Sequence, residues 1–197
     1  MRLRAPACAA LGLLLCVPAL AQPVSVPVDT GQSTLAYTGH HRLHDWTGVS
    51  RAVTGALVLD LDDPARSRVE IEVPVESFDS GNGNRDSNML DVVEADRYPT
   101  VRFVSERITA ESWETTDQGR QGTWQVEGLL TFHGQTHPLT IPVEVTVSGA
   151  TFEARSVFEV SLDAYDVDRP KLLLMPIRPT IDLEATIRAS LPVAGTD

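Results

Sequence analysis

Histidine is the residue type in this chain that most readily suggests chemistry. The sequence has five, which are His40, His41, His44, His133 and His137. Imidazoles are common ligands of zinc and copper, so the first three, joined by the other two from a hairpin, could form a metal site. On a strand, however, His40 and His41 point to opposite faces, so at most one of them could join His44. A metal site is therefore an alternative hypothesis. Hydrogen-bonded or solvent-facing histidines, with His44 oriented by Asp45 or by another carboxylate, are the simpler interpretation.

Arg85 and Asp86 form a second group that could do chemistry. A guanidinium suits bidentate contact with a phosphate, so Arg85 could pair with an anionic head group. The alternative is structural, with an Arg–Asp arrangement that pins a loop and with Asp86 as the cap of a helix.

Enzymatic chemistry has little support in the sequence. His44 and Asp45, together with a serine, could suggest a hydrolase triad, but neighbours on an extended segment rarely reach one another, and the chain lacks a GxSxG nucleophile elbow. The two cysteines, Cys8 and Cys16, both lie near the N-terminus. We therefore predict a binding protein that is not an enzyme, with no catalytic residues, no cofactor and no resident metal.

The first residues have the pattern of a secretory signal peptide. Arg2 and Arg4 precede an apolar run, and Ala19-Leu20-Ala21 supplies the small residues of a cleavage site. We expect residues 1–21, with both cysteines, to be removed and residues 22–197 to form one domain in the periplasm. The apolar run is shorter than the about 20 residues of a membrane-spanning helix, so no integral membrane span is expected.

The charge balance excludes one class of partner. The chain has 16 Lys and Arg against 27 Asp and Glu, for a net charge of -11. Sequence-independent nucleic-acid binding needs basic residues that neutralise phosphates, so we expect no nucleic-acid partner. Whether the protein forms a homodimer stays open.

Alternating apolar residues indicate strands along most of the chain. Runs with a period of two begin near Leu35, Leu57, Val69, Val101, Trp124, Leu139, Phe152 and Ile181. The runs 121–132 and 137–147 are long, and His133-Gly134 and Ser148-Gly149-Ala150 are typical hairpin turns. With no helices between them for parallel crossovers, these runs predict an all-β, antiparallel up-and-down barrel of about eight strands. A two-sheet sandwich is the alternative fold.

Residues 86–95 interrupt the alternation and predict one short helix. Met89, Leu90 and Val93 fall on one side of it, so the helix could lie across a barrel mouth, and it should end before Pro99. Residues 171–176, Lys-Leu-Leu-Leu-Met-Pro, are unusually apolar and predict either a buried bend or a lip that touches a ligand or a membrane.

Several separate motifs resemble the YceI-like family. They are Ser77-Phe78-Asp79, Asn84-Arg85-Asp86, Met89-Leu90, Tyr98-Pro99-Thr100-Val101-Arg102-Phe103 and the run from Val126 to Gly134. The motifs occur in the family's order and span most of the chain after the signal-like segment. The segment from His40 to Gly48 is richer in histidine than the family's pattern.

The resemblance implies a lipocalin-like periplasmic barrel that binds or carries a polyisoprenoid or another amphiphilic lipid. The ligand-binding candidates are Tyr37, Leu57, Leu59, Ile71, Val73, Phe78, Arg85, Met89, Leu90, Val93, Phe103, Phe132, Phe158 and Ile181. The same apolar residues could instead fill the barrel as a solid core. Two other functions stay open, a histidine-based metal-binding protein and a structural or stress-related barrel without a cavity.

Overall fold

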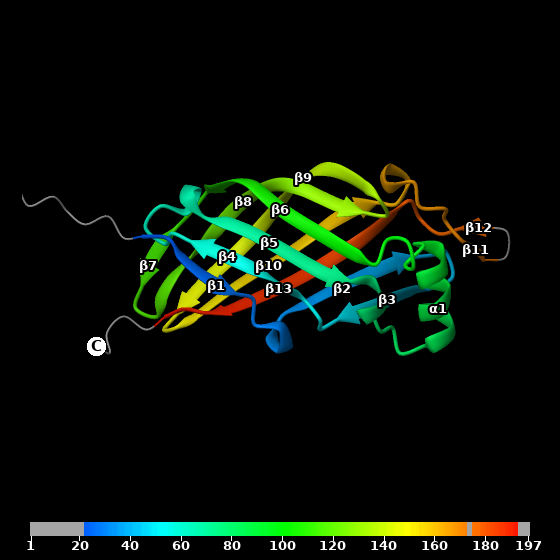
Figure 1. Cartoon of the computed structure of the whole chain (residues 1–197), viewed down its shortest axis with the longest axis horizontal. Coiled ribbons are helices and arrows are strands. Elements are labelled where there is room, and N and C mark those ends of the chain that lie inside the picture. Colours follow the sequence, from blue (N-terminus) through cyan, green and yellow to red (C-terminus); the bar gives the residue numbers. More distant parts are fainter. Residues whose placement is uncertain (1–21, 173–174, 193–197) are drawn as a thin grey trace, which may run out of the picture.

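The computed structural model describes residues 22–172 and 175–192. Its strands in chain order are β1 (Val24–Pro27), β2 (Thr34–His40), β3 (Asp45–Ser50), β4 (Thr54–Leu59), β5 (Arg68–Pro74), β6 (Thr100–Ala110), β7 (Glu114–Thr116), β8 (Gly119–Phe132), β9 (Gln135–Ser148), β10 (Thr151–Ser161), β11 (Lys171–Leu172), β12 (Met175–Pro176) and β13 (Thr180–Ser190). The α-helix is α1 (Gly83–Val92), and short 3-10 turns are η1 (Thr30–Gln32), η2 (Pro64–Arg66), η3 (Val75–Ser77) and η4 (Asp163–Tyr165). Figure 1 shows the strands winding around one elongated barrel, with α1 at one end.

The wall of the barrel has eight strand positions, which we call staves. Two of the staves are each interrupted and consist of two shorter strands. β1 pairs with β4 and β2 pairs with β3, so β1 with β2, and β3 with β4, form the two arms of one long interrupted hairpin. Counting each broken arm once, the order of staves is β1/β2, β3/β4, β5, β6, β8, β9, β10 and β13, and every pairing is antiparallel. The predicted antiparallel barrel of about eight strands is confirmed, while the individual segments are more numerous. β7 is a short addition to β8, and β11 and β12 form a separate small hairpin.

The barrel closes where β13 meets both halves of the first stave. β13 pairs with β2 along Thr34 to Thr38. Just before β2, the amide of Asp29 donates to the Arg188 carbonyl of β13 at 2.8 Å, and the Arg188 amide donates to Ser33 Oγ at 3.0 Å. These bonds continue the contact between β13 and the first stave across η1, where that stave is interrupted.

Two long strands and a tight turn form one wall of the barrel. β8 and β9 each have 14 residues, and only His133 and Gly134 separate them. Both turn residues have positive φ, 49° and 72°, which gives the strands the twist that a two-residue hairpin needs. The predicted hairpin at His133-Gly134 is therefore confirmed.

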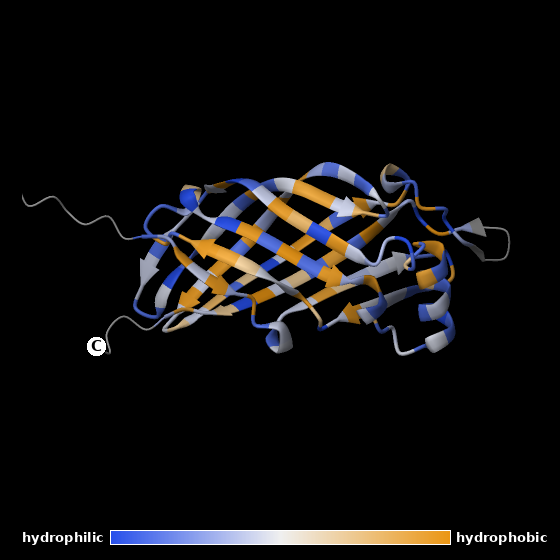
Figure 2. Cartoon of the chain, viewed as in Figure 1, coloured by the Kyte–Doolittle hydropathy of each residue, from blue (hydrophilic) through white to orange (hydrophobic). Residues whose placement is uncertain are grey.

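Alternation along the strands sorts side chains between the interior and the solvent. Figure 2 shows apolar and polar residues alternating along the staves. On β8, the side chains of Trp124, Val126 and Leu130 are all buried. They share one face because successive side chains of a strand point to opposite sides.

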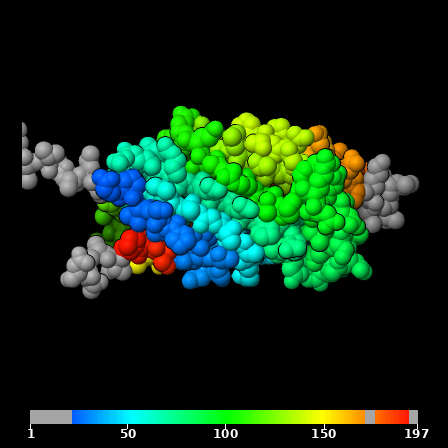
Figure 3. All heavy atoms as spheres, in the orientation of Figure 1, coloured from blue at the N-terminus to red at the C-terminus, as the bar shows by residue number. Residues whose placement is uncertain are grey.

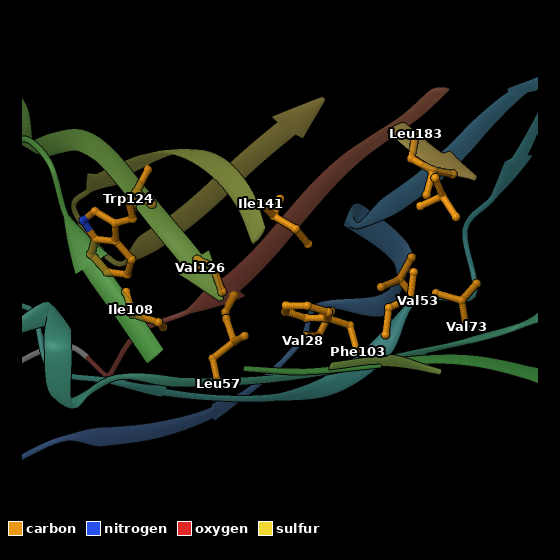
Figure 4. Packing of buried hydrophobic residues seen from close by; sticks show 14 of the residues in the cluster. Val28, Val53, Leu57, Val73, Phe103, Ile108, Trp124, Val126, Ile141 and Leu183 are labelled. Atoms are coloured by element: carbon orange, nitrogen blue, oxygen red, sulfur yellow. The ribbon is translucent and has the colours of Figure 1, made fainter. Parts of the chain in front are cut away.

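In the half of the barrel away from α1, the interior around Trp124 is closely packed. Trp124 and Ile108 are almost completely buried, and Figure 4 shows them with Val126 and Leu57 turned toward one another. The Trp113 ring lies edge-on to Trp124 at 5.1 Å, and its Nε1 donates to the Leu61 carbonyl at 2.8 Å. This half has the dense contacts of an ordinary protein core.

The helix begins and ends earlier than the sequence predicts. α1 covers Gly83–Val92 instead of 86–95, and its cap is Asn82, whose side chain accepts from the Arg85 amide at 3.1 Å. Asp86 is not the cap. Its carboxylate instead accepts from the Ser80 amide at 3.2 Å and from Ser80 Oγ at 2.5 Å, so it pins the loop before the helix.

Across the described residues, no helix has the length and apolar character needed to cross a membrane. The signal-like segment 1–21 lies outside the described residues, and so does part of the apolar stretch 171–176. The predictions made for these two segments stay predictions.

Candidate functional site

A cavity of about 350 Å³ occupies the half of the barrel that α1 covers. Its wall is formed by residues of β2, β3, β6, β8, β10 and β13, closed by η3, by α1 and by the segment before β11. Most of these side chains are apolar. Figure 3 shows α1 and the residues around it as a continuous green surface over the same end of the molecule. The volume lies within the range of about 300–1,000 Å³ that is usual for small-molecule sites.

Half of the predicted ligand-binding residues line this cavity. They are Tyr37, Phe78, Arg85, Met89, Val93, Phe132 and Ile181. The structure places the other seven outside its wall. Leu57, Leu59, Val73 and Phe103 are buried in the packed core, and Ile71, Leu90 and Phe158 are half-buried against that core. The barrel is thus neither hollow throughout nor solid throughout.

Two glycines make room for aromatic rings on the cavity wall. A Cβ at Gly48 would lie 2.5 Å from Cε1 of Tyr37, and a Cβ at Gly39 would lie 2.5 Å from Cζ2 of Trp46. Both distances are far below a van der Waals contact, so the rings can lie flat over the backbone only where the neighbour is glycine. Phe78 supports Tyr37 from the other side, edge-on, with ring centroids 5.4 Å apart.

Two buried polar atoms on the wall lack a hydrogen-bond partner. Nε2 of His41 is one, in a side chain only 5% exposed, and the hydroxyl of Tyr37 is the other. Burial raises the pKa of Tyr37, and the charge of Asp86 adds to this, while Trp46 and Arg85 act in the opposite direction. The Trp46 side chain therefore lies near the phenol without forming a well-directed hydrogen bond to it.

A hydrogen bond from the backbone identifies the acceptor nitrogen of His41. The amide of Leu43 donates to Nδ1 of His41 at 3.3 Å, so Nδ1 is an acceptor and the neutral ring bears hydrogen on Nε2. The ring of His44 lies between the rings of His41 and Trp46. Its centroid is 6.4 Å from that of His41 and 5.9 Å from that of Trp46. Four rings, those of Tyr37 on β2, Trp46 on β3, and His41 and His44 in the turn between these strands, thus line the cavity, and we call them the aromatic row.

His40 points away from the cavity, as the alternation on a strand predicts. Its Nδ1 lies 3.1 Å from Asp45 and its Nε2 lies 3.0 Å from Asp182. The hydrogen bond with Asp45 is the main cause that raises the pKa of His40, with Asp182 adding to it against the effect of burial. The prediction that Asp45 orients His44 is therefore wrong, because Asp45 contacts His40 instead.

The structure gives the metal hypothesis no support within 22–172 and 175–192. No group of three or more His, Cys, Asp or Glu residues in that part of the chain is arranged to hold an ion. His133 and His137 instead contact the η4 region, where Nδ1 of His133 lies 2.8 Å from the Tyr165 carbonyl and the His137 ring lies 4.9 Å from the Tyr165 ring.

Sequence reasoning missed several members of the cavity wall. Leu35 and Gly39 share the inward face of β2 with Tyr37, His41 continues this face just after the strand, and Trp46 lines the cavity from β3. The period of two along residues 35 to 41 was the available signal.

The residues 27–189 match the family model of the YceI-like domain. The chain belongs to the YceI-like family. Among curated relatives, a UPF0312 protein of Vibrio vulnificus is 28% identical over 144 residues, covering 71% of this chain and 72% of the relative. A UPF0312 protein of Photorhabdus laumondii is 23% identical over 140 residues, covering 70% and 68%.

Solved structures share the YceI-like fold of this chain. BcnA of Burkholderia cenocepacia has a TM-score of 0.71 at 21% identity, covering 83% of this chain and 99% of BcnA. A polyisoprenoid binding domain of Saccharophagus degradans, described as implicated in plant cell wall breakdown, has a TM-score of 0.69 at 12% identity, covering 87% and 100%. At these identities the likeness establishes the lipocalin-type barrel and leaves the ligand open.

Proposed function

We propose that this protein binds an isoprenoid-like or other amphiphilic lipid in the cavity beneath α1 and carries it through the periplasm. The observation that carries the proposal is the apolar cavity itself, which lies in the half of the barrel that α1 covers. Each Å² of apolar ligand surface removed from water contributes about 25 cal/mol, so such a wall favours a hydrocarbon chain. The polyisoprenoid binding domain of the Saccharophagus degradans neighbour has the same fold and supports this ligand class.

The proposed activity is sequestration, with no covalent step. Among the described residues, the polar atoms on the cavity wall belong chiefly to the aromatic row and to Arg85 and Asn88. These groups can orient a ligand, and the described residues that line the cavity include no serine, threonine, cysteine or lysine that could act as a nucleophile. The sequence also left open a structural or stress-related barrel without a cavity. The cavity beneath α1 does not match that alternative.

The location in the periplasm is part of the proposal and rests on the signal-like residues 1–21. Delivery to or from a membrane would depend on apolar contacts or on a partner protein, because the acidic chain is not attracted to anionic lipid surfaces.

The experiment combines extraction with a matched pair of variants on β10. Protein purified from a bacterial periplasm is extracted with organic solvent and examined by mass spectrometry, and the delipidated protein is titrated with all-trans-farnesol. Val160 is 4% exposed and lines the cavity, whereas Val157 is 67% exposed on the same strand. We expect a stoichiometric lipid in the wild type and in Val157→Phe, and weakened farnesol binding in Val160→Phe.

Two results would overturn the proposal. One is wild-type protein that carries no lipid and takes up no farnesol. The other is equal farnesol binding by Val160→Phe and Val157→Phe when both variants unfold at wild-type temperatures, because the added phenyl ring must occupy cavity space in only one of them.

A further inference from the structure

His133 lies where three segments of the cavity wall meet. It directly follows Phe132, which lines the cavity from the end of β8. Its Nδ1 lies 2.8 Å from the carbonyl oxygen of Tyr165 in η4. Its Nε2 lies 3.8 Å from Oε1 of Glu94, the second residue after α1. One side chain therefore connects the β8–β9 turn, the η4 region and the end of the helix that covers the cavity.

The backbone around His133 is strained at three places. In the part of the chain that the structure describes, the non-glycine residues with positive φ are Glu94, His133 and Asp166, at 48°, 49° and 53°. Left-handed backbone is unfavourable for a residue with a side chain, although Asp and His tolerate it better than Glu. Asp166 follows Tyr165 directly, so all three strained residues belong to one junction. Such residues gather at ligand clamps and switch regions, where the surrounding structure holds them.

The hydrogen bond to Tyr165 defines what protonation of His133 would change. A carbonyl oxygen only accepts, so Nδ1 donates and carries the hydrogen of the neutral ring. Nε2 then has a lone pair, which is buried, lacks a hydrogen-bond partner and faces a carboxylate oxygen of Glu94. Two acceptors that face each other do not attract. A proton on Nε2 converts this contact into a charge-assisted hydrogen bond once the two atoms approach by about 1 Å.

On the side of α1, the charged and titratable groups around His133 are Glu94, Arg97 and Tyr98. The second carboxylate oxygen of Glu94, Oε2, lies 3.4 Å from the guanidinium of Arg97. Arg97 also lies over the Tyr98 ring at 5.0 Å, and the Tyr98 ring contacts the imidazole with centroids 5.0 Å apart. Glu94 thus has one oxygen directed to a permanent cation and the other directed to His133.

On the side of η4, the groups near His133 are Tyr165, Asp166 and His137. Burial raises the pKa of Tyr165, so its phenol stays neutral over the range in which histidine titrates. Asp166 adds a carboxylate, which accepts a hydrogen bond from the start of β9. The His137 ring lies edge-on to the Tyr165 ring at 4.9 Å. The η4 side therefore adds a negative charge to the junction, while Glu94 supplies the carboxylate that Nε2 faces.

We propose that His133 is a pH-dependent latch on the cover of the cavity, which closes when Nε2 is protonated and pairs with Glu94. This inference rests on the proposed lipid-binding function and adds its regulation. Val92 and Val93 line the cavity immediately before Glu94, so the ion pair holds this end of α1 against β8 and η4. Bound lipid is retained in mild acid and is released faster as the pH rises through the range in which imidazole loses its proton.

The first test needs no ligand. His133→Asn keeps a residue that tolerates left-handed backbone and an amide for the Tyr165 carbonyl, but it removes Nε2. Glu94→Gln keeps the shape of the side chain and removes its charge. Unfolding equilibrium constants of the wild type, both single variants and the double variant, measured on the full mature protein, give the coupling between the two residues. We expect a coupling of about fivefold at about pH 5.5 and almost none at about pH 8.5, as for a partly exposed ion pair.

The second test measures the release of farnesol at the same two pH values by stopped flow. We expect the ratio of variant to wild-type dissociation rates to be about fivefold greater in acid, both for His133→Asn and for Glu94→Gln. Arg97→Gln is the matched control. It removes the other partner of Glu94, whose charge is constant over this range, so its ratio should not change with pH. Glu94 is 49% exposed, so Glu94→Gln carries this test even if His133→Asn does not fold.

The outcomes separate the latch from the function on which it rests. A coupling of equal size at both pH values, or release ratios of Glu94→Gln that do not change with pH, would overturn the latch and leave lipid binding in place. Wild-type protein that takes up no farnesol would instead count against lipid binding itself, and a coupling confined to acid would then show the ion pair without a lipid to retain.

Discussion

His40 lies between two carboxylates on the outer face of β2, with Asp45 on one ring nitrogen and Asp182 on the other. The histidine thereby joins the β2–β3 hairpin to β13 across the barrel closure. Its partners favour the charged ring, so the pKa of His40 is raised, and the pKa of Asp45 is lowered by its hydrogen bond with His40.

This linkage predicts a pH-dependent contribution to stability. Because the pKa of His40 in the folded protein exceeds its ordinary value of 6.5, the stabilisation is complete below that pH and is lost as the pH rises through the folded pKa. We expect the wild type to exceed His40→Gln in unfolding free energy at about pH 5.5, with a difference that shrinks toward about pH 8.5. Urea unfolding at a series of pH values measures this difference, and a constant difference would contradict the linkage.

Gly48 gives a prediction about the cavity wall. Gly48→Ala would place a methyl group against the Tyr37 ring, so the ring must move into the cavity or the hairpin must shift. We expect a loss of about 1–3 kcal/mol in unfolding free energy, as for other overpacked sites, together with weaker farnesol binding. Gly31→Ala is the control, since no atom lies within 4 Å of a Cβ at that position. Equal stability of the two variants would show that Tyr37 does not occupy this place.

At the scale of elements, α1 depends on local hydrogen bonds that fix where it starts. Asn82 caps the helix by accepting from the Arg85 amide. Asn82→Ala should therefore lower the unfolding free energy by about 1 kcal/mol, and Asn82→Asp should restore most of it. Because α1 covers the cavity, hydrogen exchange of its amides should rise in Asn82→Ala ahead of exchange in β8 and β9. Exchange that rises uniformly over the barrel would exclude a local role of the cap.

The helix also shows where reasoning from the sequence stops short. A helix near residues 86–95 was predictable from its apolar side, but Asp86 was the wrong cap, because Asn, Asp and Ser residues all occur in the segment from Asn82 to Asn88. Any of these side chains can cap a helix. The choice depends on the contact between Asp86 and Ser80, which forms only when the preceding loop takes its folded path.

At the scale of the whole molecule, the two halves of the barrel should respond differently to truncation. Leu57 is 1% exposed in the packed half, whereas Ile181 is half-buried at the cavity. We expect Leu57→Ala to lower the unfolding free energy by about 2–5 kcal/mol with farnesol affinity kept, and Ile181→Ala to cost less stability but reduce the affinity. Chemical denaturation and farnesol titration of the same preparations measure both. The reverse order of effects would contradict the division into a packed half and a binding half.

The sequence by itself determined an antiparallel all-β fold, because eight long runs have a period of two, and it indicated the family through motifs such as Ser77-Phe78-Asp79, in agreement with the YceI-like family model that matches residues 27–189. His40 and His41 also point to opposite sides, as the sequence predicts for neighbours on an extended segment: His40 contacts Asp45 and Asp182, whereas His41 lines the cavity.

Only the tertiary structure decided which inward residues enclose a space and which meet one another. Leu57 and Tyr37 both lie on inward faces, yet one packs into the core and the other borders the cavity. The difference depends on what stands opposite each residue across the barrel, where large rings such as Trp124 and Phe152 fill one half and α1 merely covers the other. Alternation along a strand carries no information about the far wall, so the position of the cavity could not be predicted from the chain alone.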